Sequence, residues 1–276
     1  MACGWRHRTR AATAGRGPSE VSEEVLLRVR DGGVLRATLN RPAKRNALNG
    51  AVFAALETLI ADCAVDVSLR AVVLSGAGGH FCAGLDLAEL AEGEAALVRN
   101  RRMGTILAGL SGLPQVVIAE VSGAAHAGGL GLACAADLVF ASADARFAAP
   151  ETRRGLVAAQ ILPWIARRAG RSEAARLVLQ AHVIGAAEAA RIGLVHGLAE
   201  DAPALAALVK GVLADILHGA PEALAETKSL LAALGPVVPP GYAEAGAQAF
   251  ARCAAGGEAA EGIAAFREKR PAAWVR

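Results

Sequence analysis

Strand-like and helix-like segments alternate along the first half of this sequence, and this pattern limits the fold classes that the chain can adopt. Short runs rich in Val, Leu and Ala have the length of buried strands, and segments with helical spacing of apolar residues separate them. Such an alternation is typical of an α/β core. The expected strands are 25–30, 34–39, 71–75, 115–121 and 138–141; the expected helices are 46–64, capped by Asn49, a short one before residue 115, and one that ends at Ala136.

From about Ala158 onward, helical patterns follow one another. These segments are 160–169, 172–181, 186–192, 202–217, 221–234, 242–255 and 257–269. They are too apolar to be stable alone, so we expect them to pack on the core or on neighbouring subunits. The predicted organisation is a disordered tail over residues 1–22, a core over 23–200 and a helical region over 201–276.

The composition is that of a folded protein with a nearly neutral body. Of 276 residues, 54% are hydrophobic and 20% are charged, which is enough apolar content for a sizeable core. The net charge of +3 arises from four arginines within residues 1–19, beyond which 25 basic residues face 26 acidic ones. This balance argues against nucleic-acid binding. The arginine-rich segment is expected to be a mis-started tail or, alternatively, an organelle-targeting peptide.

The cysteines and the uncharged stretches predict a cytoplasmic protein. The five cysteines are widely spaced and contain no Cys-x-x-Cys pair, so reduced thiols are expected rather than disulfides or a metal site. The uncharged glycine-rich stretch between Glu120 and Asp137 has 16 residues. A membrane-spanning helix needs about 20, so no membrane span is expected.

Two turns that follow buried strands have the features of an anion-stabilising site. They are residues 80–87 (His-Phe-Cys-Ala-Gly-Leu-Asp-Leu) and residues 122–131 (Ser-Gly-Ala-Ala-His-Ala-Gly-Gly-Leu-Gly). Free N–H groups and a helix dipole at such turns favour a developing negative charge, so the pair would form an oxyanion hole. Tight packing alone is the alternative explanation. A dinucleotide-binding fingerprint fits poorly, because Cys134 stands where the pattern requires its last glycine.

Four motifs in register between about residues 23 and 270 resemble the enoyl-CoA hydratase/isomerase (crotonase) superfamily. The motifs are 41–48 (Arg-Pro-Ala-Lys-Arg-Asn-Ala-Leu), 82–87, 128–137 and 147–151 (Phe-Ala-Ala-Pro-Glu). The resemblance implies an α/β fold, a crotonase-like spiral of ββα repeats whose helical C-terminal region forms homotrimers or dimers of trimers. It also implies an acyl-CoA thioester as the substrate and no cofactor beyond that coenzyme A.

Carried over to this sequence, the resemblance implies a role for each matching residue. The N–H groups of Leu85 and Gly128 would hold the thioester carbonyl, and Glu151 would be the catalytic acid and base. Substrate and CoA contacts are implied for Arg45, Ala83, Leu85, Gly128, Gly131, Phe266 and Lys269, the last two in relatives from a neighbouring subunit. Alternatively, Arg45 is a solvated surface charge and Phe266 a core aromatic.

Gly131 departs from the pattern of two-glutamate hydratases, which carry a glutamate at this position. Glycine cannot activate water, so Glu151 remains as the principal acid and base, with a pKa raised by an apolar cleft. Some relatives that hydrate branched glutaconyl-type CoA esters also look glycine-like here and resemble the run from Glu151 to Pro163. The second carboxylate of such a substrate would pair with Arg153, Arg154 or His126, unless these side chains are structural.

The sequence therefore predicts an enoyl-CoA hydratase, a lyase of fatty acid metabolism. It would hydrate a 2-enoyl-CoA thioester to a 3-hydroxyacyl-CoA through an enolate, with a branched glutaconyl-type substrate as one form of the prediction. A single-glutamate enoyl-CoA isomerase or decarboxylase is the first alternative. A catalytically weakened acyl-CoA binder is the second.

Overall fold

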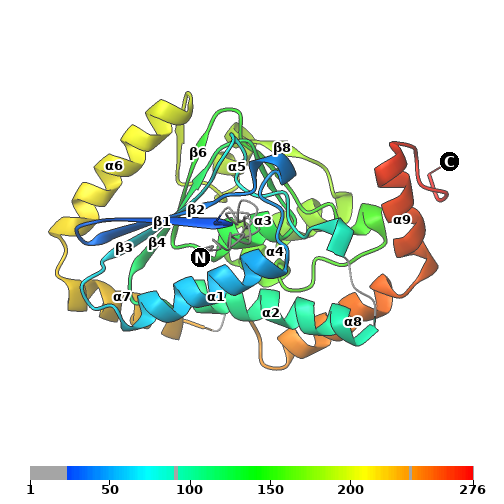
Figure 1. Ribbon diagram of the computed structural model, residues 1–276, viewed down its shortest axis with the longest axis horizontal. Helices are drawn as coiled ribbons and strands as arrows, with labels where there is room; N and C mark the ends of the chain where they lie inside the picture. Colours follow the sequence, from blue (N-terminus) through cyan, green and yellow to red (C-terminus); the bar gives the residue numbers. More distant parts are fainter. Residues whose placement is uncertain (1–23, 90–92, 236–237, 276) are drawn as a thin grey trace, which may run out of the picture.

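A six-stranded sheet with the order β1-β2-β3-β4-β6-β9 forms the centre of the computed structural model, which describes residues 24–89, 93–235 and 238–275 (Figure 1). Only β1 and β2 pair antiparallel, and the other neighbours are parallel. A smaller sheet has the order β5-β7-β8. The strands are β1 Leu26–Asp31, β2 Val34–Leu39, β3 Ala71–Gly76, β4 Val116–Val121, β5 Ala124–His126, β6 Leu138–Ser142, β7 Arg146–Ala148, β8 Ile184–Gly185 and β9 Gly197–Ala199.

Helices enclose both faces of the larger sheet, with α6 along one side and α1 and α2 along the other (Figure 1). The helices are α1 Gly50–Val65, α2 Gly93–Gly112, α3 Gly128–Ala135, α4 Leu162–Gln180, α5 Ala186–Arg191, α6 Ala202–His218, α7 Pro221–Ala233, α8 Tyr242–Ala254 and α9 Gly257–Glu268. In the described part of the chain no single helix is long and apolar enough to cross a membrane; α6 and α7 pass that test only together, as a pair bent by 103°.

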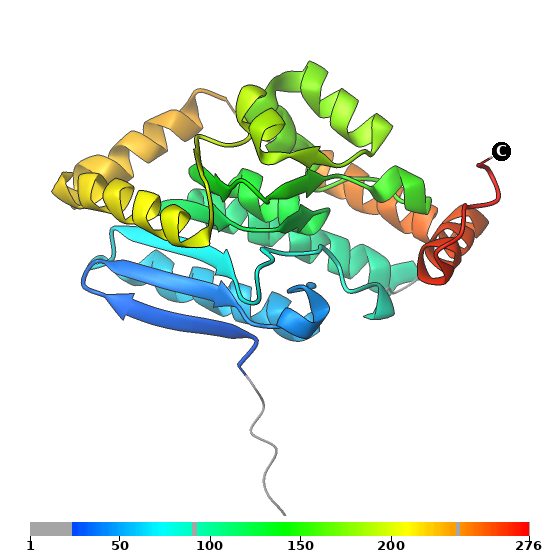
Figure 2. The same ribbon diagram turned by 90° about the horizontal axis from the view of Figure 1, so that it is seen from above.

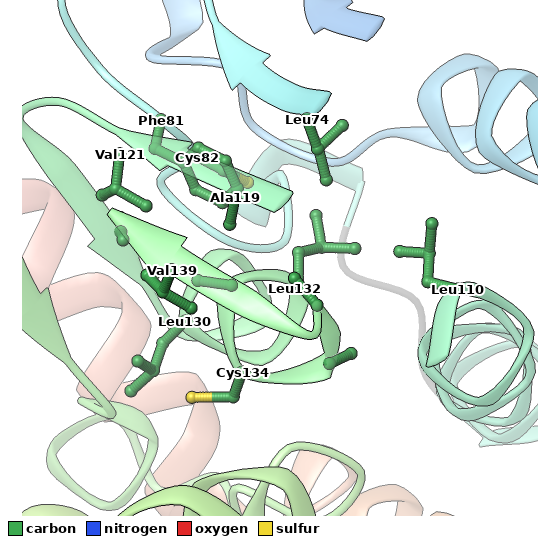
Figure 3. Packing of buried hydrophobic residues seen from close by; sticks show 14 of the residues in the cluster. Leu74, Phe81, Cys82, Leu110, Ala119, Val121, Leu130, Leu132, Cys134 and Val139 are labelled. Carbon is green, nitrogen blue, oxygen red and sulfur yellow. The ribbon is translucent and has the colours of Figure 1, made fainter. Parts of the chain in front are cut away.

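The core follows from the alternation of side chains along the strands. Ala71 and Val73 of β3 pack toward α6, whereas Val72 and Leu74 belong to the larger cluster with α1, α2 and α3. Figure 3 shows this second side, where Leu74 of the sheet lies near Leu132 of α3 and Leu110 of α2. Strands β3, β4 and β6 are covered on both faces, and they accordingly consist mostly of apolar residues.

The last helices, α8 and α9, extend the molecule away from the sheet (Figure 2). Helix α8 packs along α2, and the guanidinium of Arg101 in α2 forms two hydrogen bonds, of 2.8 and 2.9 Å, with the carboxylate of Glu244 in α8. Helix α9 lies at the end of the molecule opposite α7 (Figure 1) and contacts the 3-10 helical turn Glu151–Arg154. Helix α9, more than 100 residues later in the sequence, therefore reaches the segment that carries the predicted acid and base.

The structure confirms the predicted fold class but corrects several elements. The helix expected from residue 46 begins at Gly50, because residues 42–44 form a 3-10 turn and Arg45 and Asn46 have positive φ angles of 48° and 56°. The short helix expected before residue 115 is α2, with 20 residues. Strands β8 and β9 interrupt a part that was expected to be all-helical. The two helices expected around Gly170 are joined as one kinked helix, α4. The predicted tail over residues 1–22 lies outside the described residues.

Candidate active site

The two predicted turns meet at the rim of one pocket. Leu85 and Gly128 both line it, together with Ala127. Gly84 has a φ of +90°, and a Cβ atom added there would lie 2.6 Å from Cβ of Ala127 and 3.3 Å from the nitrogen of Gly128. Only glycine permits this approach. Among the described residues, the N–H groups of Leu85 and Gly128 have no protein acceptor, so the rim offers two adjacent free donors.

Main-chain hydrogen bonds hold the second of these turns. The Cys82 N–H donates to the Ala124 carbonyl at 2.8 Å, and the His126 N–H donates to the Cys82 carbonyl at 2.9 Å. Gly128 is the first residue of α3, so its N–H has no partner within the helix. Ala127 before it has the unusual angles φ 50° and ψ −123°. Strain of this kind in a non-glycine residue is typical of functional sites.

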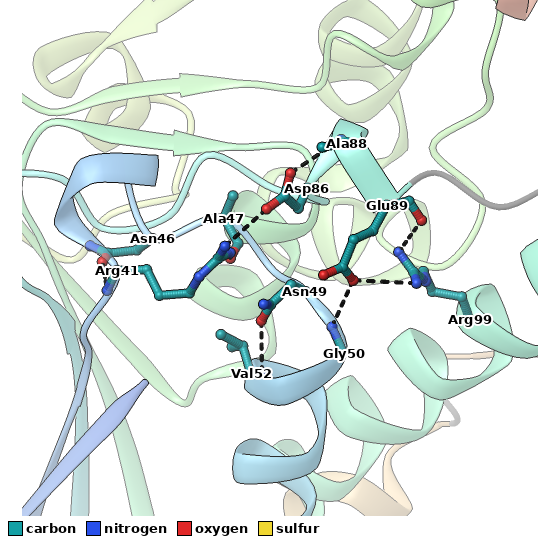
Figure 4. A network of polar contacts seen from close by, with 10 residues as sticks. All are labelled: Arg41, Asn46, Ala47, Asn49, Gly50, Val52, Asp86, Ala88, Glu89 and Arg99. Carbon is teal, nitrogen blue, oxygen red and sulfur yellow. Dashed lines mark hydrogen bonds and ion pairs between the residues drawn. The ribbon is translucent and has the colours of Figure 1, made fainter. Parts of the chain in front are cut away.

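A polar network fixes the turn that carries Leu85 (Figure 4). The flanking Gly84 carbonyl accepts from the Leu48 N–H at 2.8 Å, and the Asp86 N–H donates to the Leu48 carbonyl at 3.0 Å. The Asp86 carboxylate accepts from Arg41 at 3.1 Å, and its other oxygen accepts from the Ala88 N–H at 3.2 Å. The turn is therefore bound on both sides of Leu85, which leaves the orientation of its N–H little freedom.

Glu151 is the carboxylic acid of this pocket. It begins a 3-10 turn after β7, its side chain is 8% exposed, and its Oε2 atom has no hydrogen-bond partner among the described residues. Burial raises the pKa of Glu151 to about 7, and the nearby positive charge of Arg154 limits that rise. A carboxyl group with this pKa exchanges protons readily at neutral pH, in either direction.

The pocket is lined mostly by apolar side chains. Its walls come from α2, from the segment after Glu151 and from α8. Leu87 of the first turn also lines the pocket, and the lining residues beyond the two turns are Asn100, Met103, Glu151, Arg154, Leu156, Val157, Ala158, Ala159, Gln160, Ile161 and Phe250. Apolar lining with a few convergent polar groups is typical of small-molecule sites.

The space beside Gly131 is filled by apolar side chains. A Cβ atom added to Gly131 would lie 2.4 Å from Cγ2 of Ile161 and 3.4 Å from Leu107. The three atoms nearest to this Cβ belong to Ile161 and Leu107, and none belongs to Arg153, His126 or Gln160. The Gln160 side chain instead donates to Asn100 at 3.0 Å. No side chain larger than hydrogen fits here without movement of Ile161. Glu151 is the only carboxylic acid among the described residues that line the pocket.

The enoyl-CoA hydratase/isomerase family model matches residues 30–276. The chain belongs to this family. It is 37% identical over 252 residues to a putative enoyl-CoA hydratase of Thermus thermophilus, and the matched region covers 89% of this chain and 99% of that protein. It is 33% identical over 246 residues to the 2,3-dehydroadipyl-CoA hydratase of Escherichia coli, covering 89% and 96%. The solved structure of Pseudomonas aeruginosa AtuE is similar, with a TM-score of 0.75, 41% identity, and 92% and 100% coverage.

The comparisons confirm the predicted superfamily and, at the level of the family, the predicted class of enzyme, an enoyl-CoA hydratase. Of the residues matched to substrate and CoA contacts, Leu85 and Gly128 line the pocket, whereas Arg45, Ala83, Gly131, Phe266 and Lys269 are not among its lining residues. Arg45 is exposed, and its carbonyl accepts from the Ala83 N–H at 2.9 Å, which joins the first two motifs. Phe266 is 54% exposed, so it is not a core aromatic. Lys269 is exposed at the end of α9.

Sequence reasoning missed the contributions of α2 and α8. The pocket is also lined by Asn100, Met103 and Phe250, which lie outside the four motifs that carry the family resemblance. Asn100 is 5% exposed and accepts from Gln160. The only local signal for Phe250 is an apolar position on a helix, which does not reveal that α8 packs along α2 and brings this ring to the site.

Proposed function

We propose that this enzyme hydrates a 2-enoyl-CoA thioester to a 3-hydroxyacyl-CoA with one carboxyl group, that of Glu151. The observation that carries the proposal is the buried Glu151 carboxyl in a pocket whose rim offers the free N–H groups of Leu85 and Gly128. Two fixed donors stabilise the negative charge that a thioester oxygen gains in an enolate, each by about 3 kcal/mol.

The proposed steps balance in atoms and charge. The Glu151 carboxylate takes a proton from water while the water oxygen bonds to C3, and the electron pair of the double bond moves to the thioester as an enolate. The protonated Glu151 then gives its proton to C2, which restores the carboxylate. A pKa of about 7 for Glu151 supports both steps. We propose no cofactor beyond the CoA of the substrate, and dialysis against a chelator should leave activity unchanged.

For the finer substrate class we propose a branched, glutaconyl-type acyl chain. The resemblance of the run from Glu151 to Pro163 to such hydratases supports this choice, and so does the Arg154 cation in the pocket wall. The name of the Escherichia coli relative, a 2,3-dehydroadipyl-CoA hydratase, also describes an acyl chain with a second carboxylate.

One assay set tests the proposal. Purified protein is offered crotonyl-CoA, 3-methylglutaconyl-CoA and a 3-enoyl-CoA, and Glu151→Gln is measured beside the wild type. We expect hydration of the 2-enoyl substrates and a loss of 100-fold or more in kcat for the variant, about the effect of a general acid or base. Reaction of the 3-enoyl substrate alone would establish isomerisation, which the filled space beside Gly131 favours as the second candidate. Binding without turnover would establish a CoA-ester binder.

We propose that the C-terminal helices form a homotrimer or a dimer of trimers, with Phe266 and Lys269 near the CoA nucleotide. The support is α7, which has no buried residue among its described side chains and exposes Leu230 and Leu231. Leu231→Glu should shift the mass measured by light scattering toward the monomer. An unchanged mass would place the interface elsewhere.

We also propose a reducing compartment, the cytoplasm. The four described cysteines are free thiols, and Cys63, Cys82 and Cys134 are buried. Recovery of the protein in a cytosolic fraction would support this location, and recovery in an organelle would contradict it.

A further inference from the structure

Arg154 lines the pocket and forms no ion pair with a described carboxylate, although Glu151 is close enough to feel its charge. It lies one turn after Glu151 and is half-buried. Among the described residues, no hydrogen-bond acceptor and no carboxylate lies within bonding distance of its guanidinium. Burial lowers the pKa of Arg154, against the effect of the nearby Glu151. A partly desolvated, unpaired charge is costly in a folded protein, so its presence calls for a ligand.

Four other arginines, by contrast, are paired with carboxylates. Their pairs are Arg41–Asp86, Arg99–Glu89, Arg101–Glu244 and Arg102–Glu57. The neighbouring Arg153 is exposed and donates to the Gln180 carbonyl at 3.0 Å, away from the pocket. His126 does not line the pocket, and burial lowers its pKa, which favours the neutral ring. Of the three cationic candidates from the sequence, only Arg154 lines the pocket.

Helix α9 holds the Arg154 guanidinium in place. Its carbon lies 4.3 Å from the centre of the Phe266 ring, and a Cβ atom added to Gly262 of the same helix would lie 2.9 Å from Cα of Arg154. A guanidinium stacked on a ring keeps its N–H groups free at the edge of its plane. This edge matches the two oxygens of a carboxylate.

We infer that Arg154 is a specificity-determining residue that pairs with a carboxylate on the acyl chain of the substrate. The inference rests on the proposed function for the reaction, but it concerns which acyl chains are accepted. We assign the ligand to the acyl chain because Arg154 lines the same largely apolar pocket as Glu151, Leu156 and Val157. The CoA phosphates are common to all the esters compared below, so the test distinguishes them from an acyl carboxylate. The enzyme should therefore prefer 2-enoyl-CoA esters of dicarboxylic acids to simple 2-enoyl-CoA esters.

The test compares Arg154→Gln with the wild type on glutaconyl-CoA and crotonyl-CoA, which differ only in the terminal carboxylate. Loss of a charge-assisted pair should lower the ratio of kcat/KM values, glutaconyl over crotonyl, by about 10- to 100-fold. Arg154→Lys should recover part of the ratio because it keeps the charge. Arg153→Gln is the matched control, and its ratio should equal that of the wild type. Thermal unfolding of each variant verifies that it folds.

A binding measurement separates this inference from the proposed reaction. Titration calorimetry with the saturated esters glutaryl-CoA and butyryl-CoA needs no turnover, and wild-type protein should bind the former more tightly, with the preference lost in Arg154→Gln. If hydration fails but this preference holds, the inference stands and the reaction is wrong. If the variant weakens both esters equally, or if the wild type shows no preference, Arg154 does not recognise an acyl carboxylate and the inference is overturned.

Discussion

The raised pKa of Glu151 predicts a pH-dependent cost to the stability of the folded protein. Burial raises this pKa from 4.5 to about 7. Between these pH values the folded protein binds more protons at this site than the unfolded chain, so the free energy of unfolding falls as pH rises. The loss is complete above about pH 7. At about 1.4 kcal/mol per pH unit, the difference amounts to about 3 kcal/mol.

Glu151→Gln isolates this effect because glutamine has nearly the same shape and no titratable proton. Below about pH 4.5, the free energies of unfolding of the two proteins should differ by a constant amount. From pH 5 to pH 8 the variant should gain about 2 to 3 kcal/mol of unfolding free energy relative to the wild type. Other titrating groups are common to both proteins, and a new unpaired amide in the variant costs the same at each pH, so both cancel in this comparison.

Urea unfolding, followed by circular dichroism at pH 5 and pH 8, measures the difference. Protein concentration is held fixed, because any oligomer would make the apparent stability depend on it. Glu258→Gln, at an exposed position in the first turn of α9, is the matched control for replacement of a glutamate by glutamine outside the pocket. Equal pH dependence in Glu151→Gln and the wild type would refute the argument, since it would mean that Glu151 is ionised in the fold as easily as in the unfolded chain.

Two further substitutions test the packing around the site. Gly131→Ala should destabilise the protein by about 1 to 3 kcal/mol in urea unfolding, because its Cβ would overlap Ile161. If the double variant with Ile161→Ala shows the sum of the two single losses, so that the coupling energy is near zero, the overlap is not the cause. Asn46→Ala should cost about 2 to 4 kcal/mol, because its buried side chain bonds the Ala77 and His80 carbonyls and the residue has a positive φ. Asn40→Ala, at a more exposed loop bond, is its comparison, and equal losses would refute the role of burial.

Local patterns in the sequence were sufficient for much of the fold. The alternation of apolar runs predicted β1 to β4 and β6 within one or two residues, and Asn49 caps α1 as expected, since its side chain accepts from the Val52 N–H at 3.0 Å. These features depend on hydrogen bonds and spacings within a few residues. The turns around Leu85 and Gly128 and the position of Glu151 were found through motifs of the same short range.

The length of α2 was underestimated because local patterns do not record the tertiary contacts that stabilise this helix. Its residues have a weak apolar pattern of their own, and the helix is stabilised along one side by packing against α8 and by the Arg101–Glu244 pair. Intrinsic propensity is a weak prior where such tertiary contacts decide. The short strands β5, β7, β8 and β9 were likewise missed because they exist through pairing with distant segments.

The apolar runs and four short motifs were enough to predict an α/β chain of the enoyl-CoA hydratase/isomerase family with a glycine at position 131 and a carboxyl group at Glu151. Only the tertiary structure decided what surrounds them: Ile161 against Gly131, an apolar wall that raises the pKa of Glu151 to about 7, and Arg154 stacked on Phe266. The physical reason is that desolvation and close packing depend on atoms brought together from distant parts of the chain, which no local pattern records.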